Sequence, residues 1–291
     1  MQERVSIVSE GLKLSAVMEF PPGHQPGQKH PAIVVVHGFG ANKDAGNVTV
    51  PASLYAQWGY ISLRVDMRSC GESEGTPGHV IAMDQVRDVQ SAITYLSQRP
   101  EVLSDRIALS GTSFGGAVVI YTAGIDPRVA AVISAGGWGH GERKLKGQHP
   151  TPEGWEKFTR MLQEGREHKA KTGTSKMVHR FDIVPIPPHL RAGLPPTAVM
   201  EFPVDTAQSI FDFRPDEVVE KIAPRPILFL HAAPDSVTPT SESIEMFKRA
   251  KPPSELHLFN GVEHFMLSEN NARVNATLQA WLGNYFALPS A

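Results

Sequence analysis

The residues that best fit catalytic chemistry form a short serine motif at positions 111–115, with the sequence GTSFG. It matches G-x-S-x-G, a pattern in which a strand enters a sharp turn and a helix leaves it, so that the serine hydroxyl projects outward. An apolar run at 106–109 precedes the motif and small residues at 115–119 follow it. A glycine-rich turn with an incidental serine would match the same pattern, but the apolar run before the motif and the small residues after it favour a nucleophile at Ser113.

A serine hydroxyl needs a base to remove its proton and a carboxylate to orient that base. Asp235 and His264 follow Ser113 in that order along the chain. Each comes just after a predicted strand, at 226–230 and 255–259. Because the carboxyl ends of parallel strands meet at one edge of a sheet, we expect the three side chains to lie together.

Other residues compete for these two roles. Asp205, Asp212 and Asp216 precede the strand that should deliver the acid, so they are weaker candidates. Glu263 is adjacent to His264, and a neighbouring side chain is badly placed to bond the imidazole. The chain has 12 histidines, so a loop histidine alone means little; the place of His264 after the last predicted strand favours it.

Acyl transfer to a serine also needs backbone donors for the oxygen that becomes negatively charged. Phe114, directly after the serine, can supply one N–H. The segment 37–40 (HGFG) follows an apolar run at 32–36, and Phe39 within it can supply another. A plain turn would explain this segment too, but glycines on both sides of Phe39 suit close approach of the backbone to a ligand.

The elements that must position these residues alternate between strands and helices. The first two strands flank Glu10-Gly11 and predict a hairpin, and the later apolar runs are typical of parallel strands buried on both faces. The alternation predicts an α/β fold with a doubly wound, mostly parallel sheet. We expect strands at 5–8, 12–17, 32–36, 60–65, 106–109, 129–134, 226–230 and 255–259, and helices at 82–96, 115–123 and 274–286.

Residues 139–210 break the alternation. Between 142 and 180, ten lysines or arginines stand against five glutamates and no aspartate, and proline-rich connectors follow. So long a connection in a compact domain is usually functional. We therefore predict a helical lid at 139–210, inserted into a core of residues 1–138 and 211–291. The basic excess hints at an acidic substrate, and a solvated helical face explains it equally well.

Composition narrows the classes of function. The 291 residues are 41% hydrophobic and 20% charged, which is typical of a globular chain, and the net charge of -2 gives no basic field for nucleic acid. The apolar runs are of strand length, so we predict no membrane segment. Phosphate- and dinucleotide-binding glycine motifs and histidines at metal-ligand spacing are absent, so we predict no cofactor and no metal. A small-molecule substrate is the expected partner, and a homo-oligomer is possible.

The cysteine content and the N-terminus bear on the compartment. Cys70 is the single cysteine, which excludes an internal disulfide framework and suits a reducing environment. Residues 1–20 carry several charges and lack an uninterrupted apolar stretch, so we expect no signal peptide. Together these features lead us to expect a cytoplasmic protein.

The motifs together resemble those of the α/β-hydrolase superfamily, over about residues 30–138 and 215–286. The resemblance implies that Ser113 is the nucleophile, Asp235 the acid and His264 the base, with Phe39 and Phe114 as oxyanion donors. Strand order and lid position are also similar to the dienelactone-hydrolase-like and Xaa-Pro-peptidase-like branches, although dienelactone hydrolases use cysteine where this chain has serine. The motifs are those at 37–40, 66–75 (DMRSCGESEG, similar to D-x-R-G-x-G-x-S-x-G), 111–115, 231–239 and 261–265.

The same resemblance assigns structural roles to His37, His231 and Asp66, the last as a carboxylate that fixes a loop. Two glycines usual in the family are replaced by Ser69 and Ala232. Both changes are small and affect no triad residue.

From these residues we expect hydrolysis of small carboxylic esters through an acyl-enzyme. Fold and triad do not select the bond, so thioesters, peptides and carbon–carbon bonds of β-diketones remain alternatives. A ligand receptor built on a hydrolase scaffold is the non-enzymatic alternative.

Overall fold

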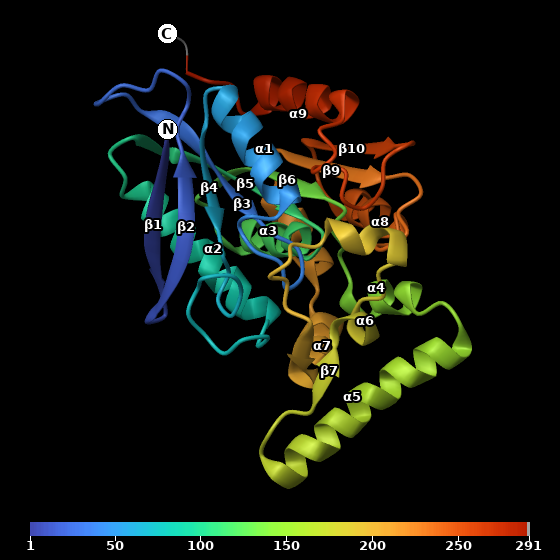
Figure 1. Ribbon diagram of the computed structural model, residues 1–291. Coiled ribbons are helices and arrows are strands. Elements are labelled where there is room, and N and C mark those ends of the chain that lie inside the picture. The colour runs from blue at the N-terminus through green and yellow to red at the C-terminus, as the bar shows by residue number, and fades with distance from the viewer. Residues whose placement is uncertain (290–291) are drawn as a thin grey trace.

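An eight-stranded sheet forms the centre of the structure, a computed structural model that describes residues 1–289 (Figure 1). The strand order is β1-β2-β4-β3-β5-β6-β9-β10. The pairs β1–β2 and β2–β4 are antiparallel, and all other neighbouring pairs are parallel. The predicted α/β fold with a mostly parallel sheet is therefore confirmed. The strands are β1 (Gln2–Ser9), β2 (Leu12–Glu19), β3 (His30–Val36), β4 (Ile61–Val65), β5 (Val102–Thr112), β6 (Val129–Ala135), β9 (Ile227–Ala232) and β10 (Ser254–Phe259).

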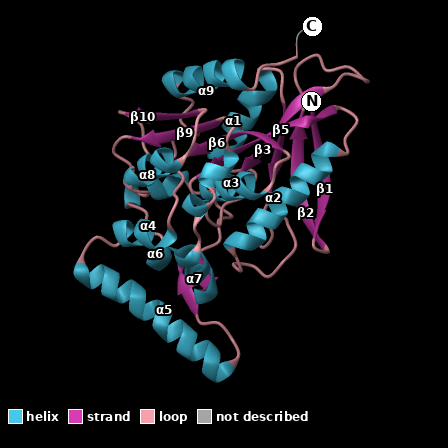
Figure 2. Ribbon diagram, turned by 180° about the vertical axis from the view of Figure 1, so that it is seen from behind, coloured by secondary structure: helices cyan, strands magenta, loops and turns pink. Residues whose placement is uncertain are grey.

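Helices cover both faces of this sheet, as the two opposite views show (Figures 1 and 2). Helices α1 (Gly46–Gln57) and α9 (Ala272–Tyr285) cover one face, and α2 (Ala82–Ser97), α3 (Phe114–Ile125) and α8 (Ser241–Arg249) cover the other. Successive side chains of a strand point to opposite faces. In β3, Ile33 and Val35 accordingly join the hydrophobic cluster around α1 and α9, whereas Val34 and Val36 join the other cluster. Burial on both faces explains the continuous apolar runs of the central strands.

The first hairpin forms where the sequence predicts it. Strands β1 and β2 pair from Gln2 with Glu19 to Ser9 with Leu12. The two turn residues, Glu10 and Gly11, have φ of +47° and +85°. Two successive positive φ values give the turn the twist that neighbouring antiparallel strands need.

Residues 139–210, which we call the cap, lie outside the sheet, and their last helix continues to Asp212. Strands β7 and β8 pair antiparallel in a short ribbon that the sequence did not predict. Helix α5 forms the outer border of the cap and packs on α7 (Figure 1). The cap contains α4 (Gly141–Gln148), α5 (Pro152–Thr172), β7 (Met177–His179), α6 (Arg180–Ile183), η1 (Pro188–Gly193), β8 (Glu201–Pro203) and α7 (Val204–Asp212).

Two short 3-10 helices, η2 (Pro215–Glu217) and η3 (Val219–Ile222), lead the chain from the cap back to β9. Within residues 1–289, no helix has the length and apolar character needed to cross a lipid bilayer.

Candidate active site

Ser113 lies in the sharp turn between β5 and α3. Its backbone has φ +55° and ψ −120°, a conformation that residues other than glycine rarely adopt. A Cβ on Gly111 would collide with the carbonyl oxygen of Gly115, and a Cβ on Gly115 would lie 2.5 Å from the carbonyl oxygen of Val36. Strand and helix therefore pass too closely for side chains at these two positions. The strained turn places Ser113 at the carboxyl end of β5.

The structure brings Ser113, His264 and Asp235 together, each from the loop after a different strand. Ser113 Oγ lies 2.9 Å from His264 Nε2, and His264 Nδ1 lies 2.8 Å from Asp235 Oδ2. The side chains of His264 and Asp235 are 1% and 0% exposed. Hydrogen bonds are electrostatically stronger in such a water-poor environment than in water. This geometry allows a proton to pass from the serine to the imidazole.

The carboxylate of Asp235 is held on both oxygens. Its Oδ1 accepts hydrogen bonds from the backbone N–H groups of Val237 and Thr238, both at 2.8 Å. Its Oδ2 faces His264 and also lies 3.1 Å from His231 Nε2. Burial raises the pKa of Asp235, but the charges and hydrogen bonds of the two histidines outweigh burial and hold this pKa below its ordinary value. Asp235 is therefore ionised at neutral pH and fixed in orientation.

His231, to which the sequence assigned only a structural role, directly contacts the acid. Its Nε2 lies 3.1 Å from the carbonyl oxygen of Thr238 as well as 3.1 Å from Asp235 Oδ2. Because a carbonyl oxygen can only accept, Nε2 carries the proton and donates. Nδ1 lies 2.6 Å from Ser243 Oγ, and that hydroxyl lies 3.4 Å from the carbonyl oxygen of Gly137. The four-residue spacing between His231 and Asp235 is the sequence signal that could have revealed this contact.

The carboxylates that the sequence left as weaker candidates bind other groups. Within residues 1–289, Asp235 is the one carboxylate hydrogen-bonded to His264. Asp205 pairs with Lys169, Asp212 accepts from Gln208, Asp216 lies near Arg143 and Arg249, and Glu263 accepts from Ser236.

The two predicted oxyanion donors lie beside the serine. A Cβ on Gly38 would stand 3.4 Å from Ser113 Cβ, so the loop that carries Phe39 passes directly along Ser113. Phe114 is the first residue of α3, whose first-turn N–H groups lack acceptors within the helix. In the described part of the chain, neither the Phe39 nor the Phe114 N–H donates to another residue. Both amides are therefore available as donors near Ser113.

His37 orients the first of these amides. The N–H of Met67 donates to His37 Nε2 at 3.1 Å, so Nδ1 carries the proton and donates to the carbonyl oxygen of Gly38 at 2.8 Å. In a trans peptide the carbonyl and the following N–H point in opposite directions. Fixing the Gly38 carbonyl therefore also fixes the direction of the Phe39 N–H. Burial lowers the pKa of His37, which keeps the ring in the neutral form that both bonds need.

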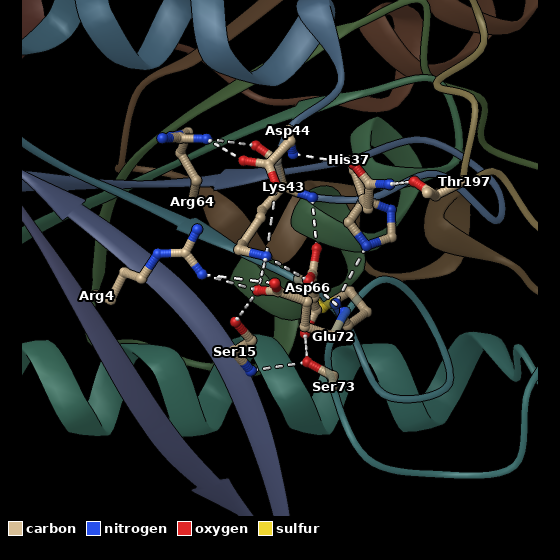
Figure 3. A network of polar contacts seen from close by, with 12 residues as sticks. Arg4, Ser15, His37, Lys43, Asp44, Arg64, Asp66, Glu72, Ser73 and Thr197 are labelled. Atoms are coloured by element: carbon tan, nitrogen blue, oxygen red, sulfur yellow. Dashed lines mark hydrogen bonds and ion pairs between the residues drawn. The ribbon is translucent and has the colours of Figure 1, made fainter.

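A buried ion cluster supports the same loop from behind (Figure 3). Asp66 Oδ1 accepts from the Lys43 N–H at 2.6 Å, and Asp66 Oδ2 accepts from Lys43 Nζ and from the Glu72 N–H, both at 2.9 Å. The side chain of Glu72 lies 2.6 Å from Lys43 Nζ. The side chains of Lys43 and Asp66 are 1% and 0% exposed. The cluster ties the loop after β3 to the loop after β4, which is the role the resemblance implied for Asp66.

Residues 27–271 match the protein family described as "Serine aminopeptidase, S33". The chain belongs to this family of α/β hydrolases. It is similar to the polyketide transferase grgF of Penicillium sp, with 27% identity over 249 residues that cover 81% of this hydrolase and 82% of the relative. An uncharacterized 31.7 kDa protein of Escherichia coli is 27% identical over 247 residues, 82% of this chain and 83% of its own length.

A third relative matches a shorter part of this hydrolase. The thiohydrolase aneE of Aspergillus aculeatus is 37% identical over 107 residues, which cover 36% of this chain and 33% of the relative. Among solved structures, the α/β hydrolase GrgF from Penicillium sp. aligns with a TM-score of 0.81 and 24% identity, and the alignment covers 99% of each chain. This likeness shows that the two proteins share the whole fold, cap included.

A small pocket between the core and the cap borders Ser113 and His264. Its volume is only about 30 Å³, whereas pockets that bind small molecules usually hold about 300–1,000 Å³. Residues of the core and of the cap share the wall of this pocket. A larger groove of about 400 Å³ lies against α5 and does not include Ser113. The residues around the small pocket include Phe39, Asn47, Ile186, Leu194 and Phe265.

The basic excess of the cap is mostly a solvated surface. Four of its basic side chains, all at least 45% exposed, pair with nearby carboxylates. Two others are buried, Lys144 and Arg180, each 3% exposed. A solvated helical face therefore explains the basic residues of the exposed pairs. It does not explain the two buried cations, Lys144 and Arg180. The exposed pairs are Lys157–Asp182, Arg160–Glu156, Lys169–Asp205 and Lys176–Glu164.

Proposed function

We propose that this hydrolase cleaves carboxylic esters of small molecules through an acyl-enzyme formed on Ser113. The observation that carries the proposal is the continuous hydrogen-bond chain from Ser113 Oγ through His264 to Asp235. Membership of an α/β-hydrolase family supports hydrolytic chemistry at such a serine. The same chain supports an enzyme over a ligand receptor, because a receptor has no need of a serine bonded to an oriented base.

In the first half of the proposed reaction, His264 Nε2 takes the proton of Ser113 as Oγ attacks the ester carbonyl carbon. Asp235 keeps the imidazole in the correct tautomer and stabilises its protonated form. The carbonyl oxygen becomes negatively charged and accepts from the N–H groups of Phe39 and Phe114. His264 then gives the proton to the leaving oxygen, so the alcohol departs and the acyl group stays on Ser113.

The second half repeats these steps with water. His264 removes a proton from a water molecule, which attacks the acyl carbon. The same two N–H groups hold the second oxyanion. When the bond to Ser113 Oγ breaks, His264 returns the proton to the serine, and the carboxylic acid leaves.

The pocket supports a small, largely apolar substrate. Its walls include Ile186, Leu194 and Phe265, which suit hydrocarbon. Two polar side chains, Asn47 at the start of α1 and Arg180 of the cap, also line this pocket, and Asn47 is 7% exposed. A buried amide gains from a polar partner. Asn47 is thus placed to bond an oxygen atom of the substrate.

Replacing Ser113 with alanine tests the proposal. We expect turnover of short-chain aryl esters to fall by about 10³-fold or more, because removal of a triad member leaves only the residual catalysis of the oxyanion hole and binding. Circular dichroism should show an unchanged fold. Ser236→Ala is the matched control, since that hydroxyl bonds Glu263 and not the triad. Equal rates for Ser113→Ala and wild type would refute the assignment.

Thioester hydrolysis is the second candidate, and the similarity to a protein named thiohydrolase favours it. The acyl-enzyme is the same, and only the leaving atom differs. Assaying an oxygen ester and a thioester of one acyl group, beside an anilide and a β-diketone, ranks the four bond types directly. A fluorophosphonate probe should label wild type at Ser113. Absence of labelling together with absence of turnover on all four substrates would instead support a binding protein.

A further inference from the structure

Arg180 of the cap reaches into the loop that carries the proposed oxyanion donor. It is the first residue of α6 and is 3% exposed. Its Nη2 donates to the carbonyl oxygen of Phe39, and its Nη1 donates to those of Gly40 at 3.3 Å and Val199 at 2.9 Å. The guanidinium carbon also lies 5.2 Å from the centre of the Phe39 ring. One side chain of the cap thus holds the main chain and the side chain of Phe39.

Arg180 makes these contacts without a counter-charge. Within residues 1–289 it forms no ion pair with a carboxylate, and its Nε has no hydrogen-bond partner. Burial lowers the pKa of Arg180 to about 10, so the guanidinium remains protonated at neutral pH. A buried charge that only carbonyl groups solvate is costly. Its position on the wall of the Ser113 pocket indicates a use in the site.

Further cap groups bind the same loop. The N–H of Val199 donates to the Gly40 carbonyl at 3.0 Å, and the ring of Phe202 stacks on Phe39 with centroids 4.3 Å apart. Gly40 makes room for them: it has φ +53°, and a Cβ there would lie 2.5 Å from Phe202 Cζ and 3.0 Å from Arg180 Nη1. The loop after β3 and the cap are therefore built to fit each other closely.

We propose that Arg180 is a positioning residue that completes the oxyanion hole only when the cap is docked. His37 holds the peptide before Phe39 through the Gly38 carbonyl, and Arg180 holds the peptide after it through the Phe39 carbonyl. With both neighbouring peptide planes held, the Phe39 N–H keeps one direction. The proposal rests on the proposed function, which assigns that N–H to the oxyanion.

This arrangement links substrate entry to catalysis. The docked cap leaves only about 30 Å³ beside Ser113, so a substrate enters when cap residues such as Ile186 and Leu194 have moved. The cap then returns, and the bonds of Arg180 to the loop re-form. Closure thereby restores the donor that the reaction needs, as loop closure completes the site in other enzymes.

The test compares Arg180→Met and Arg180→Lys with Arg160→Met, a control that removes an exposed cap charge. Each protein is assayed with an aryl ester and its thiono analogue, in which sulfur replaces the carbonyl oxygen. Sulfur accepts hydrogen bonds poorly, so the ratio of the two kcat/KM values reports donation to this atom. The ratio does not depend on the fraction of enzyme that is folded.

We expect Arg180→Met to lower kcat by about 10- to 100-fold, less than the ~10²–10³ that follows complete removal of one donor. KM should change by less than about threefold, and the ester-to-thionoester ratio should fall about tenfold, because donation to the reacting oxygen is lost. Arg180→Lys should lie between, and Arg160→Met should match wild type. In a further variant, Arg180→Ala, added guanidinium ion should partly restore kcat at a concentration that does not denature the protein.

An unchanged ratio in Arg180→Met, with activity lost only through KM or through unfolded protein, would overturn the proposal. If wild type hydrolyses neither substrate, the ester proposal itself fails. The rate of Ser113 phosphonylation by a fluorophosphonate then replaces turnover, because that reaction also places an oxygen in the hole. Slower phosphonylation of folded Arg180→Met supports the positioning role, and equal rates refute it.

Discussion

Replacing Asp235 with asparagine reverses one hydrogen bond of the triad with almost no change of shape. The backbone N–H groups of Val237 and Thr238 both donate to Oδ1, so the amide oxygen of asparagine must occupy that place. Its NH₂ group then takes the place of Oδ2, where it faces His264 and also removes the acceptor of the His231 N–H. Because this group only donates, His264 Nδ1 must accept, and Nε2 carries the proton. A protonated Nε2 cannot take the proton of Ser113.

The expected loss follows from this forced tautomer. The wrong tautomer in a Ser-His-Asp triad costs about 10⁴ in kcat, which is about 5 kcal/mol at 1.36 kcal/mol per tenfold change. The structure supports the full loss of kcat, because the asparagine side chain has one favourable orientation. Rotating the amide by 180° would set its NH₂ against two backbone donors, so this escape is closed. KM should change little, since Asp235 is fully buried behind His264.

The same substitution also changes stability in a pH-dependent way. The folded state holds the pKa of Asp235 below its ordinary value. A depressed carboxyl pKa contributes stability above the ordinary value of about 4, and the contribution is lost as pH falls toward the folded-state pKa. We therefore expect Asp235→Asn to be less stable than wild type at pH 7, with a difference that shrinks below pH ~4.

The assay is kcat on a short-chain aryl ester, with urea unfolding at pH 7 and at a pH of about 3, below the ordinary carboxyl pKa. Glu263→Gln is the matched control, because Glu263 is the neighbouring acid and its carboxylate bonds Ser236. It should keep the wild-type kcat. If Asp235→Asn retains more than about a tenth of the wild-type kcat, Asp235 does not set the tautomer of His264 and the reasoning is wrong.

Three further substitutions test other parts of the structure. Burial lowers the pKa of Lys144 to about 7, so between pH ~7 and ~10 the unfolded chain binds one more proton at this residue than the folded chain does. Lys144→Met should therefore raise the free energy of unfolding at pH 7 by up to about 4 kcal/mol and remove the rise in wild-type stability toward pH 10. Urea unfolding curves of the variant and the wild type that coincide at both pH values would contradict this. Gly40→Ala should lower kcat about tenfold, because its Cβ would displace Phe202 and Arg180; a normal kcat in folded protein would count against the coupling. Leu194→Ala should raise kcat/KM for a hexanoate relative to an acetate ester about tenfold by enlarging the pocket, and an unchanged ratio would show that Leu194 does not limit chain length.

The core strands could be predicted because their signal is local. Burial on both faces demands continuous apolar runs, and each predicted run lies within or overlaps a strand of the sheet. Helix α1 could not be predicted because it lacks such a local signal. It contains Pro51, and its apolar residues do not form a single stripe, so its sequence lacks the helical period. The β7–β8 ribbon has only three residues in each strand, too few to show alternation.

Within the site, the predictable residues are those that follow strands. Ser113, Asp235 and His264 each stand just after an apolar run, and the topology of a parallel sheet then brings them to one edge. His231 was given a structural role because it belongs to the end of β9, yet it also donates to the acid. Asn47 lies in the missed helix α1, so no pattern marked it.

The sequence alone determined the turn at Ser113 and the edge of the sheet that carries the proposed chemistry. Gly111 is constrained by the backbone of nearby Gly115, a local steric limit, whereas Gly115 is constrained by the carbonyl oxygens of Val36 and His37 from a neighbouring strand and its loop. The cap's part in the site was decided only by tertiary structure. Arg180 is one of ten similar cations in its segment, and it meets Phe39 across 141 positions of chain. That meeting depends on how the cap packs against the core, and no local pattern records it.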